Sequence, residues 1–226
     1  MTQINNHRRV NDILLGPLER PTLKWLAAHM PAWVTPDTCT MVGLLGALGV
    51  AASYILTVYD RSFLWLASLG FVVNWLGDSL DGTLARHRRI ERPIYGFFVD
   101  HTIDAFSVSV IVLALGLTPY VTFTVACLML IAYLLLSVLV FVRTSAVGEF
   151  KISYSKLGPT EVRVFAILLN TVMYFGGVET SLAALGPFSQ ILNPYDLFLA
   201  ILALLLLCFF IVTAVQETRK LAKENK

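Results

Sequence analysis

Residues 78–86 read D-S-L-D-G-T-L-A-R and residues 96–104 read G-F-F-V-D-H-T-I-D, with nine residues between the two strings. Together they place four aspartates, Asp78, Asp81, Asp100 and Asp104, at the edges of two long apolar segments. An ionisable side chain in a membrane helix is energetically costly and is usually functional. Four carboxylates this close together repel one another unless cations lie between them. The two strings therefore predict a helical membrane fold that contains a cation-binding site.

The composition of the whole chain indicates an integral membrane protein. The 226 residues have a mean hydropathy of +0.72 and only 14% charged residues, whereas soluble domains carry about a quarter. About 20 apolar residues span the bilayer core as a helix, and a helix satisfies its own backbone hydrogen bonds in lipid. The expected fold class is therefore all-α. No apolar run follows the polar first residues, so a cleavable signal peptide is not expected.

Six apolar segments are candidates for membrane spans. They run roughly over residues 40–58, 62–80, 97–117, 120–142, 160–176 and 194–215. With six spans, sixteen of the 17 lysines and arginines fall on one side of the membrane, and only Arg61 falls on the other. Lysine and arginine are enriched on the cytoplasmic side. We therefore expect six transmembrane helices with both termini in the cytoplasm.

The segment before the first span has a different character. Residues 11–33 mix apolar positions such as Leu18 and Trp25 with too many polar residues for a span, which is typical of an interfacial amphipathic helix. The predicted organisation is a cytoplasmic N-terminal segment (1–33), a six-helix membrane catalytic domain (34–217) and a basic cytoplasmic tail (218–226). Thr35 or Asp37 is expected to cap the first span.

The spacing of the aspartates predicts how they face one another. Asp78 and Asp81 are three residues apart and share a face of the second span. Gly96, Asp100 and Asp104 follow at intervals of four and form a stripe on the third span. If the short basic loop folds these spans into an antiparallel pair, the four carboxylates surround one cavity near the cytoplasmic interface. Oxygen-only ligands select hard cations such as Mg²⁺ or Mn²⁺, and two such ions can clamp the oxygens of a phosphoryl displacement.

Small residues and one arginine accompany the carboxylates. Gly82 and Gly96 lack side chains where a ligand could approach the backbone, and Ala85 keeps the same wall small. Arg86 lies one turn beyond Gly82 and could pair with a phosphate oxygen. This combination favours a metal–diphosphate pocket over a proton relay.

The two strings resemble the signature of the CDP-alcohol phosphotransferases (CDP-alcohol phosphatidyltransferases), D-x-x-D-G-x-x-A-R followed after eight or nine residues by G-x-x-x-D-x-x-x-D. The fixed positions present here are Asp78, Asp81, Gly82, Ala85, Arg86, Gly96, Asp100 and Asp104. The resemblance covers most of residues 11–175, and it departs at Asp37, where the family usually has asparagine. It implies a metal-dependent enzyme of phospholipid biosynthesis that transfers a substituted phosphate group from a CDP-linked alcohol to the hydroxyl of a second alcohol and releases CMP.

The resemblance also implies roles for individual residues. The implied ligands of two Mg²⁺ or Mn²⁺ ions are Asp78, Asp81, Asp100 and Asp104, the last of which could instead act as the base. The implied cytidine–diphosphate pocket is formed by Gly82, Ala85, Arg86 and Gly96. The implied partners are a CDP-alcohol donor, an alcohol acceptor, membrane lipids and a second copy of the chain, with one substrate a lipid and no nucleic acid. The site would face the cytoplasm from a bacterial inner membrane or an intracellular membrane.

A finer resemblance points to one branch of the family. Asp100-His101 is similar to the D-H-x-x-D of the choline and ethanolamine phosphotransferases, as is G-P-T-E at residues 158–161. This favours CDP-choline or CDP-ethanolamine with diacylglycerol, and CDP-diacylglycerol with a polyol or amino acid remains the alternative. His101 is a candidate general base, or it faces a neighbouring helix. Glu161 is a second candidate, or a carboxylate at a helix N-terminus.

Two further readings stay open at this point. Asn74, one turn before Asp78, could hydrogen-bond within the cavity, although a bond between helices is favoured. An acidic cluster in a membrane would also suit a cation transporter or channel. The glycines and the arginine at fixed spacing have no evident task in ion passage, so we favour the enzyme.

Overall fold

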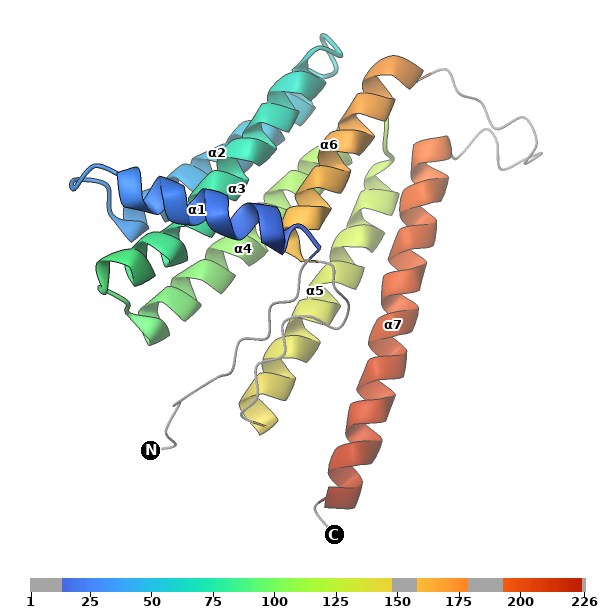
Figure 1. Cartoon of the computed structure of the whole chain (residues 1–226). Coiled ribbons are helices and arrows are strands. Elements are labelled where there is room, and N and C mark those ends of the chain that lie inside the picture. The colour runs from blue at the N-terminus through green and yellow to red at the C-terminus, as the bar shows by residue number, and fades with distance from the viewer. Residues whose placement is uncertain (1–13, 148–157, 179–192, 225–226) are drawn as a thin grey trace.

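The computed structural model describes residues 14–147, 158–178 and 193–224, and within these ranges the chain forms seven helices and no strand (Figure 1). The helices are α1 (Gly16–His29), α2 (Pro36–Leu56), α3 (Phe63–Arg88), α4 (Pro93–Leu115), α5 (Phe123–Val147), α6 (Pro159–Gly176) and α7 (Pro194–Glu224). The all-α prediction is confirmed. The predicted N-terminal segment before residue 14 and the last two residues of the basic tail lie outside the described residues.

Five helices in the described part of the chain are long and apolar enough to cross a membrane: α2, α3, α4, α5 and α7. The fifth predicted segment, residues 160–176, forms α6, which is not one of these five helices. Its 18 residues include Glu161, Arg163 and Asn170, and these polar side chains lower its hydropathy. The helical membrane architecture is therefore as expected, while the count of six spans and the side on which the termini lie remain predictions.

Helix α3 extends further than its hydropathy predicts. The second apolar segment was expected to end near residue 80, but α3 continues to Arg88 and ends where Arg89 adopts a left-handed backbone with φ of 58°. Hydropathy marks where a helix leaves the lipid, not where its backbone hydrogen bonds stop. As a result, the whole first string of the motif is helical.

Glycines bring α2 and α3 into close contact. A side-chain carbon on Gly77 would lie 2.5 Å from Gly43 Cα, and one on Gly46 would lie 2.5 Å from the backbone nitrogen of Asn74. Small residues allow membrane helices to approach in this way. Asn74 Nδ2 then donates a hydrogen bond to the Gly43 carbonyl at 2.9 Å, which is the interhelical bond that the sequence favoured. Helix α2 also packs against α4, so it supports both helices that carry the aspartates.

The structure shows how α2 begins and how the helix before it packs. Thr35 caps α2, because its hydroxyl accepts a hydrogen bond from the Thr38 nitrogen at 3.1 Å. Helix α1 crosses the bundle (Figure 1) and buries Leu23 and Ala27 against α3, while the side chains of Leu18 and Trp25 are 73% and 61% exposed. This separation of buried and exposed apolar faces suits a helix that lies in a membrane interface.

Candidate functional site

A small cavity lies between α3 and α4 and is also lined by α2. Its lining comes from these three helices and consists of Thr40, Gly43, Leu44, Asn74, Asp78, Asp100, Ile103, Asp104 and Ser107. The cavity therefore combines three of the four predicted aspartates with Asn74 and two hydroxyl side chains.

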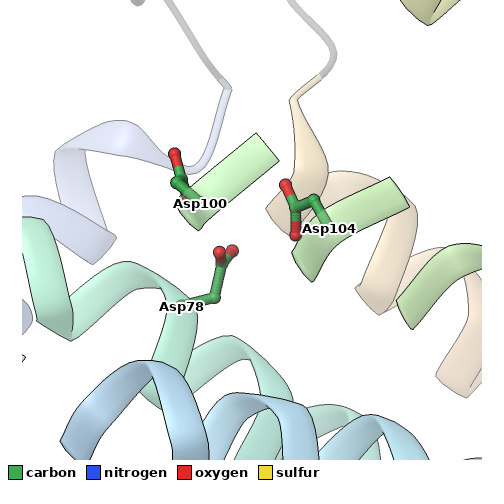
Figure 2. Close-up of side chains that lie close together, drawn as sticks. All are labelled: Asp78, Asp100 and Asp104. Carbon is green, nitrogen blue, oxygen red and sulfur yellow. The ribbon is translucent and has the colours of Figure 1, made fainter. Parts of the chain in front are cut away.

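Three carboxylates converge at this cavity. Asp78 from α3 and Asp100 and Asp104 from α4 each offer one oxygen, and these oxygens lie within 4.8 Å of one another. Figure 2 shows Asp78 facing the two carboxylates of α4. The side chains are only 20%, 28% and 34% exposed, respectively. A compact set of carboxylate oxygens of this kind is the donor set that hard divalent cations prefer.

The fourth aspartate has other partners. Asp81 Oδ2 accepts a 2.8 Å hydrogen bond from the Thr40 hydroxyl of α2, and Asp81 Oδ1 accepts one from the backbone nitrogen of Gly82. Asp81 is not part of the converging group. The structure thus brings three of the four predicted metal ligands together and turns the fourth toward α2, so the metal-binding role of Asp81 stays a prediction.

Arg163, one of the sixteen basic residues predicted to lie on the cytoplasmic side, reaches the site. Arg163 Nη2, from the second turn of α6, lies 2.8 Å from Asp78 Oδ2 and 3.9 Å from Asp104 Oδ1. Arg163 Nε donates to Asn74 Oδ1 at 2.8 Å, so buried Asn74 links α2 to α6. The available signal was a charged residue inside an apolar segment, since such residues usually face the interior of a bundle.

The predicted nucleotide-binding residues lie on the same two helices but do not line the cavity. Gly82 is next to Arg86, because a carbon added to Gly82 would lie 3.2 Å from Arg86 Nη1. The exposed Arg86 side chain donates to the Thr83 hydroxyl at 3.2 Å. Ala85 is half-buried, and the space around the exposed Gly96 is open within 4 Å. Their predicted roles in nucleotide binding remain predictions.

His101 lies beside Asp100 and also faces a neighbouring helix. Its ring stacks on Phe97 with centroids 4.2 Å apart and meets Phe141 of α5 edge-on at 5.3 Å. His101 Nδ1 is 2.9 Å from the Phe97 carbonyl oxygen and 3.6 Å from Asp100 Oδ2. The carbonyl accepts a hydrogen bond only if Nδ1 carries the proton, which assigns the tautomer of a neutral ring.

Glu161 connects α6 to α1. Its Oε1 accepts a hydrogen bond from the Leu15 nitrogen at 2.9 Å, and its Oε2 accepts one from the Gly158 nitrogen at 2.8 Å. Glu19 of α1 reinforces the connection by accepting a 3.0 Å bond from the Thr160 hydroxyl. These contacts are those of a carboxylate at a helix N-terminus, and the catalytic role of Glu161 stays a prediction.

Arg88 also has a role beyond topology. Its guanidinium donates to the backbone oxygens of Met30 at 3.1 Å, Pro31 at 2.8 Å and Val34 at 2.5 Å. These oxygens belong to the connection between α1 and α2. Arg88 therefore joins the connection after α1 to the end of α3, close in sequence to the first motif. Lys151 and Lys156, predicted to carry positive charge on the same side, lie outside the described residues.

The fold and the site define a class of protein: an all-helical membrane protein in which carboxylates from two helices converge as a donor set that suits hard cations. The sequence model of the CDP-alcohol phosphatidyltransferase family matches residues 33–216. Because this match covers most of the chain, the chain belongs to that family.

Three relatives point to one branch of the family. The chain is 35% identical over 103 residues to cholinephosphotransferase 1 of Xenopus laevis (42% of this chain and 25% of that protein). It is 33% identical over 107 residues to cholinephosphotransferase 1 of Gallus gallus (44% and 31%) and 29% identical over 126 residues to that of Mus musculus (51% and 30%). The match thus spans between a quarter and a third of these relatives. It confirms the resemblance to the choline and ethanolamine phosphotransferase branch.

Proposed function

We propose that this protein transfers a substituted phosphate group from a CDP-linked alcohol to the hydroxyl of a second alcohol and releases CMP. The observation that carries the proposal is the convergence of Asp78, Asp100 and Asp104 within 4.8 Å of one another inside the family's signature. We further propose CDP-choline or CDP-ethanolamine as the donor and diacylglycerol as the acceptor. The names of the relatives and the histidine after Asp100 support this choice.

The residues of the cavity fit a divalent cation and an oxygen-rich substrate. The three carboxylates are an oxygen-only donor set, which suits Mg²⁺ or Mn²⁺. Ser107 Oγ and Arg163 Nη1 are buried without a hydrogen-bond partner among the described residues, and buried polar groups of this kind normally have one. We propose that Asp78, Asp100 and Asp104, joined by Asp81, hold two metal ions. When bound, these ions would neutralise the charge of the diphosphate and polarise its phosphoryl oxygens.

The remaining chemistry belongs to side chains of this chain. The acceptor oxygen forms a bond to the phosphorus that carries the donor's alcohol, and the bond from that phosphorus to the oxygen retained by CMP breaks. The proton of the acceptor hydroxyl passes to a base, for which we propose Asp104, with His101 as the second candidate. We propose that Gly82, Ala85, Arg86 and Gly96 line the pocket for the cytidine diphosphate. The carboxylates then lie between this pocket and the interior of the bundle.

The proposed setting is the cytoplasmic leaflet of a bacterial inner membrane or an intracellular membrane, with the protein as a homodimer. The distribution of lysine and arginine over the chain supports this orientation. The exposed apolar face of α1 supports contact with the membrane surface. A site near the interface allows a lipid and a water-soluble substrate to meet.

CMP release tests the proposal. The purified protein in lipid nanodiscs receives Mn²⁺ or Mg²⁺ together with either CDP-choline or CDP-ethanolamine and diacylglycerol. A parallel set receives CDP-diacylglycerol with polyol or serine acceptors, and both CMP and the lipid products are measured. We expect CMP and a product lipid in the first set. Product only in the second set would assign the protein to the alternative subclass. The absence of CMP with every donor, from folded protein that binds Mn²⁺, would exclude the enzyme.

A further inference from the structure

A buried arginine occupies the acidic site from a helix that carries none of the motif. Arg163 projects from α6, and its side chain is only 12% exposed. Its Nη2 lies 2.8 Å from Asp78 Oδ2 and 3.9 Å from Asp104 Oδ1. One guanidinium therefore contacts two of the three converging carboxylates, which together carry three negative charges when ionised.

The hydrogen bonding of this guanidinium is incomplete. Nε donates to Asn74 and Nη2 to Asp78, but Nη1 is buried and has no hydrogen-bond partner among the described residues. Arginine offers five N–H donors in a planar fork, and leaving the donors of a buried charged group unpaired is costly. Hydrogen bonding alone therefore does not explain why Arg163 is buried here. Electrostatic attraction to the carboxylates does explain it.

We propose that Arg163 is the internal counter-ion of this site and that a divalent cation displaces its guanidinium from Asp78. A cation that binds Asp78 at about 2.1 Å would lie roughly 4–6 Å from the guanidinium in its present position. Two positive groups at that separation repel each other strongly, and both compete for the same carboxylate. Arg163 therefore holds the carboxylates together before metal binding and lowers the affinity for the metal.

This inference deepens the proposed function, because it assumes that Asp78 and Asp104 are metal ligands. It predicts a property of the protein without substrate. The metal affinity is set by competition with a residue of the same chain, so removing the positive charge of Arg163 should tighten metal binding. A residue that only oriented Asp78 would have the opposite effect, since loss of a partner that orients a ligand usually weakens metal binding about 10–100-fold.

The test measures Mn²⁺ binding to the purified protein in nanodiscs by electron paramagnetic resonance, without nucleotide. We expect Arg163→Gln to bind Mn²⁺ about tenfold or more tightly than the parent, whereas Arg163→Lys, which keeps the charge, stays within about threefold. Arg143→Gln removes another buried arginine, one that pairs with Glu217 of α7 at 3.0 Å, and should leave binding unchanged. Unchanged or weaker binding by Arg163→Gln would overturn the inference.

A second measurement uses the unaltered protein and is decisive if Arg163→Gln does not fold. Phenylglyoxal modifies guanidinium groups, and mass spectrometry reports the extent of modification at Arg163. We expect Mn²⁺ to increase modification of Arg163 several-fold, because the cation releases the guanidinium from Asp78. An unchanged or slower reaction would contradict displacement.

The outcomes separate this inference from the proposed function. If the parent releases CMP but Arg163→Gln binds Mn²⁺ no more tightly, the counter-ion role of Arg163 is refuted and the proposed enzymatic activity is retained. If Arg163→Gln binds Mn²⁺ more tightly as expected but no donor yields CMP with the parent, the counter-ion role of Arg163 is supported and the proposed reaction is refuted.

Discussion

The hydroxyl of Thr40 donates a 2.8 Å hydrogen bond to Asp81 Oδ2, across a separation of 41 residues in the chain. This bond draws one of the four motif carboxylates toward α2, while Asp78, Asp100 and Asp104 converge on one another. The four aspartates are therefore not equivalent in this structure. Thr40 and Arg163 each hold one carboxylate of the first string, Asp81 and Asp78 respectively.

The Thr40→Val variant should show whether Asp81 only holds α3 to α2 or also binds metal. The variant removes the hydroxyl partner of a partly buried carboxylate, which we expect to cost about 1–3 kcal/mol of stability. If Asp81 turns to bind metal, the loss is smaller in Mn²⁺ than in chelator. Thermal unfolding midpoints in the two conditions measure this difference.

Thr171→Val is the matched control for this experiment. Its hydroxyl donates only within its own helix, to the Ile167 carbonyl at 2.9 Å. Any loss of thermal stability in the Thr171→Val variant should be the same in Mn²⁺ and in chelator. An equal loss for Thr40→Val in both conditions would argue against metal binding by Asp81.

Gly77→Ala should separate the two helices that support the site. The added carbon would lie 2.5 Å from the Cys39 carbonyl oxygen and from Gly43 Cα. These are backbone atoms, so the helices must move apart, and we expect a loss of about 1–3 kcal/mol in the free energy of unfolding. Gly49→Ala, where nothing lies within 4 Å of the added carbon, should change it by less than about 1 kcal/mol. Similar thermal stability of the two variants would refute close packing at Gly77.

Asp104→Asn should abolish turnover while leaving the fold and CDP binding intact. The substitution conserves shape but removes the proposed base, for which losses of about 10²–10⁴ in rate are typical. CMP release and binding of labelled CDP measure the two effects. Asp60→Asn, in the connection between α2 and α3, should change the rate less than about twofold. Turnover by Asp104→Asn close to that of the parent would remove it from the mechanism.

His101→Ala tests the second candidate base and has a close structural control. We expect CMP release to fall by about 10² or more if the imidazole takes the proton, with Mn²⁺ binding retained. His29 of α1 makes similar contacts, since its Nδ1 is 2.8 Å from the Trp25 carbonyl oxygen and its ring lies 4.4 Å from that of Trp25. His29→Ala should leave the rate nearly unchanged. A rate for His101→Ala within about threefold of the parent would exclude it as the base.

Periodicity explains which parts of the site were predictable. Asp100 and Asp104 are four residues apart, so a helix places them on one face whatever surrounds it. Asp78 and Asp81 are three apart and also share a side of α3, but Thr40 of α2 attracts only Asp81. The sequence pattern predicts the face of a helix, and it does not predict which neighbour each side chain on that face will meet.

Hydropathy had a similar limit. It located all six apolar segments as helices, including residues 160–176 as α6. The six-span pattern also counts Arg163 only as a positive charge on the predicted cytoplasmic side. In the structure Arg163 pairs with Asp78, 85 residues away in the chain. A mean over a window of residues cannot report a single charged side chain that turns into the bundle.

The sequence by itself determined the helical membrane class, the acidic motif and the family, because composition, residue spacing and the order of fixed residues are properties of the chain alone. Only the tertiary structure decided that three carboxylates converge, that Thr40 holds the fourth and that Arg163 completes the site. These contacts depend on how closely α2 and α3 approach at Gly43 and Gly77 and on where α6 packs against α3. The physical reason is that local periodicity orients a side chain about its own helix, whereas its partner is set by the packing of helices distant in sequence.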